Sequence, residues 1–385
     1  MKIGIPKEIL PGETRVAASP DSVKKFTALG VEMIIQLGAG EAASISDEML
    51  QEAGARIVPD AASLYAEADM IFKVGGPCCN GNGLVDEVAM MKPDAILIGL
   101  LNPLNRRDQA EAYAKHGLTS FAMELIPRIS RAQSMDALSS QSNISGYKAV
   151  IDAAETFGKI LPMMMTAAGT IVPARVLILG AGVAGLQAIA TAHRLGAIVS
   201  AFDVRPAVKE QVESLGATFV EVKNAETDSA ETAGGYAREM SADYQRQQSE
   251  LIHQTLKNQD ICITTAQIPG KPAPVLITEA MVKDMKVGSV IVDLSTETGG
   301  NCELSERDAV VVKFGVTIIG YANYPARVPG DTSSLYARNL YNFISPMIDG
   351  ETGGIKIDWD DEVIKGALLT RDGCVVHAAL TGQKT

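Results

Sequence analysis

Three glycines with the spacing G-x-G-x-x-G are the first candidates for chemistry in this sequence. Gly180, Gly182 and Gly185 follow the apolar run 175–179 and precede the helix-like run 186–195. In a strand, turn and helix, the first glycine permits the turn, the second lets the backbone approach a pyrophosphate, and the third lets helix and strand pack closely. The pyrophosphate then lies at the helix N-terminus. The spacing therefore predicts a dinucleotide site.

An acidic residue follows this turn at the distance that such a site requires. A second apolar run, 198–202, leads to Asp203, which lies 18 residues after Gly185. A carboxylate there binds an adenosine ribose 2′-hydroxyl and repels a 2′-phosphate, which favours NAD(H) over NADP(H). Arg205 argues in the opposite direction, because its guanidinium can reach a 2′-phosphate. An ordinary strand–helix turn would account for the glycines but not for this acid.

Further cofactor contacts are expected beside the turn, beside the acid and at the ends of two later strands. These residues are Val183, Ala184, Val204, Ala266 and Leu294. The carboxyl ends of parallel strands meet at the crevice where a dinucleotide binds, so residues distant in sequence converge there.

A second group of polar residues is dense enough to serve a reacting cofactor. Arg128 can pair with a phosphate or polarise a carboxamide, and Gln133, Asp136 and Ser139 can hydrogen-bond a sugar or an amide. Helix capping would account for Ser134 or Asp136 alone. It would not account for so many polar groups in one short segment, so we predict that these four residues are catalytic.

A proton acceptor is harder to find. A dehydrogenase that oxidises an alcohol or an amine needs a general base as well as a hydride path. The four histidines lie within helix patterns or near the C-terminus and are poor candidates: His116, His193, His253 and His377. Lys73, at the end of an apolar run, is the best basic candidate, and the turn 12–15 is either a binding feature or a solvated loop.

Composition excludes several classes of function. The net charge of −12 argues against nucleic-acid or anionic-membrane binding, which favours clustered Lys and Arg. Five cysteines without a C-x-x-C pair argue against a metal site and a disulfide framework, and fit a reducing cytosol. Neither a signal peptide nor a membrane span is expected. If the chain acts at a membrane, another chain must anchor it.

The elements that must position these residues follow an alternating pattern. In the first part of the chain, short apolar runs at 2–5, 31–35, 70–74, 95–98 and 118–122 alternate with helix-like segments. This alternation is typical of βαβ units and a parallel sheet. The glycine motif opens a second series of the same kind, which continues to the apolar runs near 320.

We therefore expect an α/β fold with two doubly wound, Rossmann-like domains, separated by a cleft and joined by long helices. Residues 1–140 plus 330–385 form the first, discontinuous domain, and residues 141–329 form the NAD(H)-binding domain. A helix over 144–157 carries the chain out of the first domain, and one over 332–343 carries it back. The tail, with the alternating run 355–359, rejoins the first domain.

Two segments fit this pattern less well. Residues 223–248 are polar and contain Gly235 and Tyr236, which suggests a functional or disordered loop. Gly235 would act as a hinge beside an aromatic lid, so both residues are assigned to the cofactor site. The methionines at 163–165 are interpreted as core filler.

Four motifs together resemble one family. Residues 128–140, 180–185, 233–236 and 268–274 closely resemble the NAD(H)-binding component of proton-translocating NAD(P) transhydrogenases, the soluble part of the alpha subunit. The resemblance covers essentially the whole chain. A wider resemblance, to alanine dehydrogenases, includes residues 4–8 and 13–16, Lys73, the glycine motif and residues 299–300.

The first resemblance implies a reaction and an assembly. Hydride passes reversibly from NADH on this chain to NADP⁺ on a partner component, coupled to proton translocation by a separate membrane-spanning component. It implies a homodimer attached peripherally, through its partners, to the cytoplasmic face of the inner membrane. It also implies that Arg128, Gln133, Asp136 and Ser139 hold the nicotinamide and that Tyr236 belongs to a mobile loop.

Departures from the alanine dehydrogenase pattern separate the two readings. By resemblance, those enzymes have a catalytic histidine where this chain has residues 98–101, an aspartate where Glu297 stands, and no loop like 128–140. Two alternatives remain open: an alanine dehydrogenase-like enzyme, and a catalytically silent NAD-binding regulator.

Overall fold

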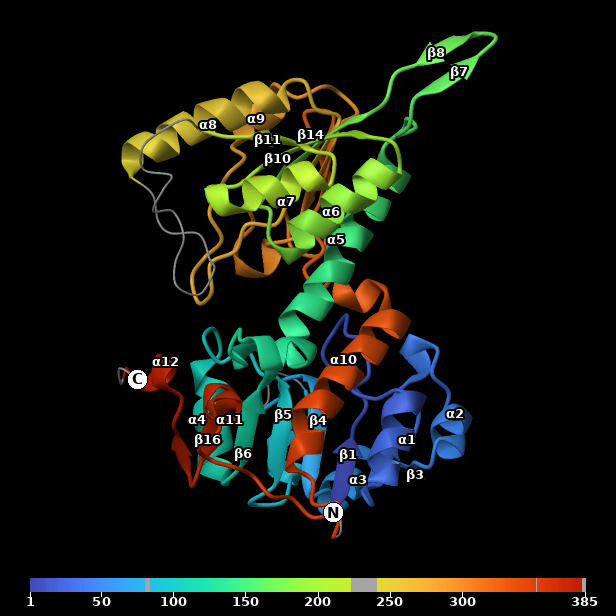
Figure 1. Ribbon diagram of the computed structural model, residues 1–385, viewed down its shortest axis with the longest axis vertical. Coiled ribbons are helices and arrows are strands. Elements are labelled where there is room, and N and C mark those ends of the chain that lie inside the picture. Colours follow the sequence, from blue (N-terminus) through green and yellow to red (C-terminus); the bar gives the residue numbers. More distant parts are fainter. Residues whose placement is uncertain (80–83, 223–240, 351, 383–385) are drawn as a thin grey trace. The chain divides into compact units, whose positions relative to one another are not determined.

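The computed structural model describes residues 1–79, 84–222, 241–350 and 352–382 (Figure 1). Contacts between residues divide the chain into two compact units. The first holds Met1–Gln141 together with Pro325–Thr385, and the second holds Ser142–Tyr324. The division into domains 1–140 plus 330–385 and 141–329 stays a prediction.

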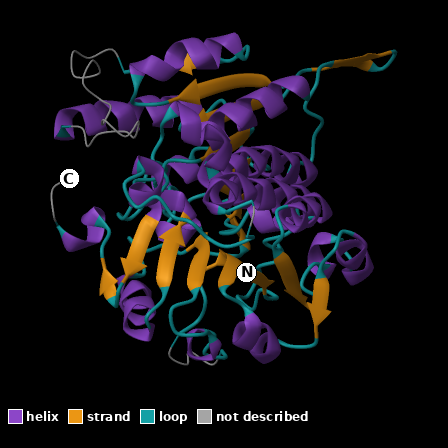
Figure 2. Ribbon diagram, turned by 60° about the horizontal axis from the view of Figure 1, so that its bottom comes forward, coloured by secondary structure: helices purple, strands orange, loops and turns teal. Residues whose placement is uncertain are grey.

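The first unit is built on a mostly parallel sheet with the order β17-β16-β6-β5-β4-β1-β2-β3. Its parallel strands are β1 (Lys2–Ile5), β2 (Glu32–Gln36), β3 (Arg56–Val58), β4 (Met70–Gly75), β5 (Ile96–Leu100) and β6 (Thr119–Ala122). The strand order reverses between β1 and β4, and that reversal is the topological switch point of a doubly wound sheet. Helices lie on both faces of this sheet (Figure 2).

The C-terminal segment completes this first sheet. Strands β16 (Leu368–Arg371) and β17 (Cys374–Val375) add to it in antiparallel pairs beyond β6. The tail thus rejoins the first unit, and in the run 355–359 Ile357 and Trp359 pack against that unit's core while Ile355 forms an isolated bridge with Ile348. The unit's helices are α1 (Pro20–Ala28), α2 (Asp47–Glu52), α3 (Ala61–Glu67), α4 (Arg107–His116), α10 (Pro329–Ile344), α11 (Glu362–Ala367) and α12 (Ala378–Thr381).

The second unit has a sheet with the order β11-β10-β9-β12-β13-β15-β14. Its strands are β9 (Arg175–Leu179), β10 (Ile198–Phe202), β11 (Thr218–Val220), β12 (Ile261–Thr264), β13 (Val290–Asp293), β14 (Val310–Lys313) and β15 (Val316–Ile319), of which only β14 is antiparallel. The helices are α6 (Val183–Arg194), α7 (Lys209–Ser214), α8 (Ala242–Leu256) and α9 (Glu279–Lys283). The order again reverses, between β9 and β12, at the glycine motif.

Burial on both faces explains why the strands read as continuous apolar runs. In β9, Val176 and Ile178 pack into one buried cluster, whereas Leu177 and Leu179 pack into another. Side chains alternate between the faces of a strand, and a parallel sheet covered by helices buries both. The expected α/β class with two mostly parallel, doubly wound sheets is confirmed.

Helix α5 (Ala137–Thr156) runs across the boundary between the units, as the sequence suggested for a helix over 144–157, but it begins earlier. Helix α10 begins after the second boundary and lies wholly within the first unit, so it does not carry the chain between units. The polar stretch 223–248 also differs from expectation, because its last residues belong to α8, which Ser241 caps.

The methionines at 163–165 are not core residues, and that interpretation was wrong. They lie in or beside a two-stranded hairpin formed by β7 (Met164–Thr166) and β8 (Gly169–Ile171), which extends outward from the second unit (Figure 1). Met165 is 77% exposed, and Val172, just after the hairpin, is 76% exposed. The hairpin thus presents apolar side chains to solvent.

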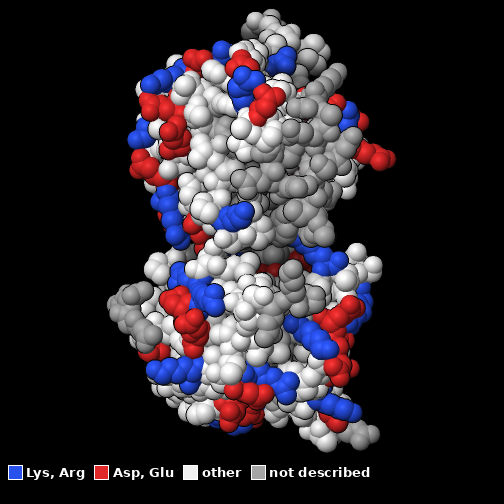
Figure 3. Space-filling model, turned by 90° about the vertical axis from the view of Figure 1, so that its left-hand side faces the viewer, with Lys and Arg blue, Asp and Glu red and all other residues white. Residues whose placement is uncertain are grey.

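Within the described ranges, no helix is long and apolar enough to cross a membrane. In the same ranges, no three His, Cys, Asp or Glu side chains gather as a metal ion would require. On the face shown in Figure 3, basic and acidic side chains are interspersed among the described residues.

Candidate nucleotide-binding site and Arg128 loop

The glycine turn follows β9 directly and opens α6. Gly180 has a φ of +99°, and a Cβ at this position would lie 2.6 Å from Thr265 Oγ1. A Cβ at Gly185 would overlap the carbonyl oxygen of Gly180. A Cβ at Gly182 would meet no atom within 4 Å. Gly180 and Gly185 are therefore required by the fold itself, whereas the absence of a side chain at Gly182 leaves open space at the helix N-terminus.

That N-terminus is suited to an anion. Gly182 is the N-cap residue of α6 and supplies no capping side chain, and Val183 and Ala184 begin the helix. The amides of a first helical turn have no partner within the helix, and the helix dipole adds positive potential there. An anion next to Gly182 would accept hydrogen bonds from these amides.

Asp203 lies just past the end of β10 and is buried. Its Oδ2 accepts hydrogen bonds from Ala181 N at 2.8 Å and from an Arg205 terminal nitrogen at 2.7 Å. Its Oδ1 accepts from Arg205 N and Arg205 Nε, both at 2.9 Å. The acid therefore contacts the glycine turn, as the sequence spacing suggested, and its carboxylate is fully engaged by the protein.

Two later strands supply the rest of this edge. Ala266 follows β12, and its amide donates to Asn301 Oδ1 at 3.0 Å while its carbonyl accepts from Asn301 Nδ2 at 2.9 Å. Leu294 follows β13, and its amide donates to Thr264 O at 3.0 Å. Asn301 was not expected from the sequence, because its role depends on a clamp between segments 35 residues apart.

A buried carboxylate beneath this edge was also missed. Asp293 ends β13, and its Oδ1 accepts from Ser295 N at 2.9 Å. Its Oδ2 accepts from Asn301 N, Cys302 N and Ser305 Oγ at 2.7–2.9 Å. These bonds fix the turn that carries Asn301. An acid at a strand end was the one available sequence signal.

The Arg128 loop lies in the first unit. Arg128 and Gln133 are exposed, and residues Ser130–Met135 form a 3₁₀ helix, η4. Asp136 accepts hydrogen bonds from Ser139 N at 2.9 Å and Ser139 Oγ at 2.5 Å, at the start of α5. Asp136 and Ser139 thus contact each other and cap a helix. The structure brings this pair together and leaves Arg128 and Gln133 at the surface.

Contacts with α10 and α11 hold the loop in place. Asn339 and Asn342 each donate from Nδ2 to Ser134 O, at 2.9 and 3.0 Å. Arg131 forms a two-point ion pair with Asp361, with both N···O distances at 2.8 Å. The Arg131 guanidinium, followed by backbone amides, lowers the pKa of Asp361 to about 2. The C-terminal segment therefore fixes the conformation of the loop.

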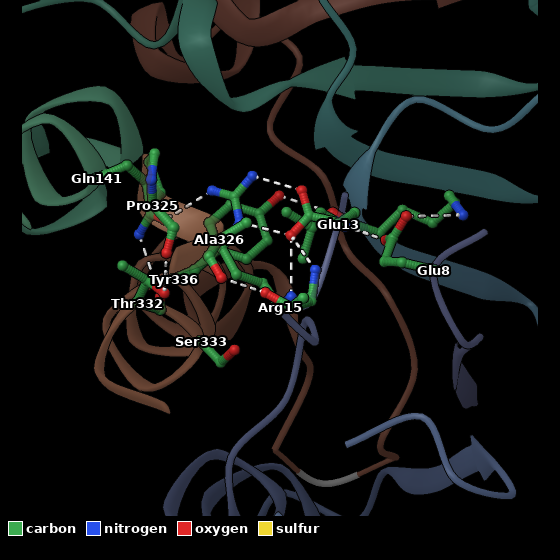
Figure 4. Close-up of polar contacts among 12 residues, drawn as sticks. Glu8, Glu13, Arg15, Gln141, Pro325, Ala326, Thr332, Ser333 and Tyr336 are labelled. Atoms are coloured by element: carbon green, nitrogen blue, oxygen red, sulfur yellow. Dashed lines mark hydrogen bonds and ion pairs between the residues drawn. The ribbon is translucent and has the colours of Figure 1, made fainter. Parts of the chain in front are cut away.

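Lys73 and Arg15, also in the first unit, are neutralised by carboxylates. Lys73 is 0% exposed and pairs with Glu8 at 3.2 Å and Glu87 at 2.8 Å. Burial lowers the pKa of Lys73, but the two glutamates outweigh it and leave the pKa raised. Arg15 contacts Glu13 at 2.6 Å and Gln141 at 2.7 Å (Figure 4). The two glutamates therefore favour the protonated form of Lys73, which cannot accept a further proton.

Glu124, just after β6, makes stability depend on pH. Its Oε1 accepts from Asn102 N, and its shielded Oε2 has no hydrogen-bond partner among the described residues. Burial raises the pKa from 4.5 to about 7. The folded state holds this proton more tightly than the unfolded state does. The contribution of Glu124 to the free energy of unfolding is therefore fully present below pH 4.5 and is lost as the pH rises through about 7.

We expect Glu124→Gln to remove this dependence, because a neutral amide replaces the carboxylate. At pH 8 the variant should be more stable than the parent by about 3 kcal/mol, and near pH 4.5 the difference should nearly vanish. Urea unfolding at both pH values measures the change. Equal stability of the two proteins at pH 8 would show that the carboxylate is not destabilising.

Comparison with known proteins places this geometry in a family. Residues 4–145 match the family model "Alanine dehydrogenase/PNT, N-terminal domain", and residues 149–378 match "Alanine dehydrogenase/PNT, C-terminal domain". The chain belongs to the alanine dehydrogenase/PNT family.

Within this family, the chain is more similar to transhydrogenases than to alanine dehydrogenases. It is 56% identical, over the full length of both chains, to the first part of the NAD(P) transhydrogenase alpha subunit of Rhodospirillum rubrum. A transhydrogenase structure from Sinorhizobium meliloti is 45% identical with a TM-score of 0.87, covering 98% of this chain and 100% of that chain. An L-alanine dehydrogenase structure is 26% identical with a TM-score of 0.79, covering 99% and 98%.

Gly235 and Tyr236, which the sequence assigned to a cofactor lid, lie outside the described residues. The assignment of all site residues, including Val204, stays a prediction.

Proposed function

We propose that this chain is the NAD(H)-binding component of a proton-translocating NAD(P) transhydrogenase. The observation that carries the proposal is the glycine turn with open space at Gly182, contacted by the Asp203 carboxylate, at the switch point of the second sheet. The similarity to named transhydrogenase subunits supports it. The reaction is reversible hydride transfer from NADH on this chain to NADP⁺ on a partner component.

In this proposal, the residues divide into two roles. Gly180, Gly182, Val183, Ala184 and Gly185 receive the pyrophosphate at the start of α6. Asp203, Val204 and Arg205 define the adenosine ribose position, Ala266 and Leu294 line the strand ends, and Gly235 and Tyr236 cover the nucleotide. Arg128, Gln133, Asp136 and Ser139 orient the nicotinamide, and no metal takes part.

The proposed partners follow from the same reaction. An NADP(H)-binding component receives the hydride, and a membrane-spanning component moves the proton. This chain would act in the cytoplasm, attached peripherally through those partners to the inner membrane. The experiment is to mix the purified chain with an NADP(H)-binding component and follow NADH-linked reduction of an NADP⁺ analogue. Absence of transfer, with both nucleotides bound, would contradict the proposal.

We also propose that the chain is a homodimer in which the β7–β8 hairpin contacts a second copy. Met165 in the hairpin and Val172 just after it are exposed, and these apolar side chains are shielded from water only if another surface covers them. Met165→Glu and Val172→Glu should each place a charge in that contact and shift the protein toward monomers. Light scattering after size exclusion measures the mass.

Val287→Glu is the matched control for this prediction. Val287 is 82% exposed and lies in the same unit, but away from the hairpin in sequence. The Val287→Glu variant should leave the dimer intact. A parent protein that is monomeric at micromolar concentration, or hairpin variants that remain dimeric, would contradict the proposal.

An alanine dehydrogenase activity is not expected. Such a reaction needs a general base, and Lys73 is held protonated by two buried glutamates. The strand end that would carry a histidine has Leu101, which is buried. We expect no alanine-dependent reduction of NAD⁺ at alkaline pH, and Leu100→His alone should not create it. A measurable rate with alanine, absent when alanine is omitted, would overturn this expectation.

A further inference from the structure

The Asp203 carboxylate is occupied by its own chain in a specific way. Each carboxylate oxygen accepts one backbone amide and one guanidinium nitrogen. The backbone donors are Ala181 N on Oδ2 and Arg205 N on Oδ1, and the guanidinium donors are Arg205 Nε on Oδ1 and a terminal nitrogen on Oδ2. The two side chains are nearly buried, with 14% of Arg205 and 6% of Asp203 exposed.

This arrangement leaves no acceptor position for a ribose. An ionised carboxylate offers about four lone-pair positions, and all four are filled. The backbone amides hold one position on each oxygen and orient the carboxylate toward the glycine turn. The guanidinium holds the second position on each oxygen. A ribose diol would bring two hydroxyl donors that need those same two positions.

We propose that the Arg205 guanidinium occupies the ribose-recognition position of Asp203 in the free protein and is displaced when the adenosine ribose binds. Arg205 is then an internal competitor that sets the affinity for NADH. The proposal rests on the dinucleotide site proposed above. It assigns Arg205 a role other than attraction of a 2′-phosphate.

The same contact bears on selection of the cofactor. A ribose diol can replace the guanidinium because its hydroxyls donate hydrogen bonds. A 2′-phosphate carries no hydroxyl donor at that position and brings negative charge toward the carboxylate, so it cannot replace the guanidinium on both oxygens. NADPH would therefore have to bind with the Asp203–Arg205 pair intact or overcome the repulsion of an exposed carboxylate.

The test is equilibrium titration of NADH and NADPH into the parent chain, Arg205→Met and Arg205→Lys. Methionine keeps an unbranched apolar side chain without the donors, and lysine keeps the charge without the two-point geometry. We expect Arg205→Met to bind NADH about tenfold more tightly, which corresponds to about 1.4 kcal/mol. Arg205→Lys should lie between the parent and Arg205→Met. Affinity for NADPH should not improve in either variant.

If the parent chain does not bind NADH, the proposed function fails rather than this inference. If the parent binds NADH and Arg205→Met binds it equally well, the displacement is wrong. If Arg205→Met binds NADH more weakly, the displacement is also wrong and the guanidinium contacts the bound nucleotide. If Arg205→Met unfolds, a crystal structure of the parent with NADH decides. The ribose hydroxyls on Asp203 with Arg205 moved away support the proposal, and a retained ion pair overturns it.

Discussion

Gly182→Ala is expected to abolish most NADH binding while leaving the fold intact. An added Cβ meets no protein atom within 4 Å, so the variant should unfold at the parent temperature. The methyl group would occupy the space through which a pyrophosphate reaches the amides at the start of α6. A hydrogen bond to a charged group contributes about 1.5–3 kcal/mol, and loss of one to two of them weakens binding by roughly tenfold to ten-thousandfold.

Gly185→Ala is the matched comparison for this prediction. Its Cβ would overlap the carbonyl oxygen of Gly180, so the turn itself must move. Overpacking of this kind costs typically about 1–3 kcal/mol, and the melting temperature should fall together with NADH affinity. Thermal unfolding and an NADH titration on both variants separate the two roles. A Gly182→Ala variant with the parent's dissociation constant would show that the pyrophosphate does not bind at this turn.

Arg128→Ala is expected to slow hydride transfer by about a hundredfold in the reconstituted complex, with little change in NADH affinity. A small displacement of a reacting ring costs on the order of a hundredfold in rate. Arg128 and Gln133 are exposed in the free chain, so their removal should not disturb the core. Single-turnover transfer and equilibrium titration on the same variants measure the two effects.

Asp136 needs a different substitution, because it also caps α5 through its contacts with Ser139. Alanine would remove a cap and cost about 1 kcal/mol of stability. Asparagine would retain a capping oxygen without the charge, so Asp136→Asn tests the proposed role in transfer without a large effect on folding. If Arg128→Ala and Asp136→Asn both transfer hydride at the parent rate, the loop is structural and its assignment to the active site is wrong.

The parts that the sequence predicted well depend on local spacing. The distance from Gly185 to Asp203 reflects one helix followed by one strand, and the Asp203 side chain does contact the turn, at Ala181. The parallel sheets were predictable because both faces are buried, which makes each strand a continuous apolar run. The strand β3 was missed, because its three residues include only two aliphatic side chains.

The parts that the sequence could not predict depend on which distant segments meet. Lys73 was the best candidate base in the sequence. Its two neutralising partners, Glu8 and Glu87, come from other segments of the chain, so the sequence did not reveal them. The two-point pairing of Arg205 with Asp203 depends on a rotamer and not on spacing. The methionine-rich sequence of the hairpin resembles that of a buried segment. Only the structure shows that no described residues cover these side chains.

Hydride transfer between two nucleotides is the activity that the proposed function requires. The purified chain, loaded with NADH, is mixed with an NADP(H)-binding component that carries an NADP⁺ analogue, and the reduced analogue is followed in a single turnover. We predict rapid reduction that requires both proteins and is nearly lost with Arg128→Ala. No reduction by the parent complex, together with oxidation of NADH when pyruvate and ammonia are added to this chain alone, would contradict the proposed function.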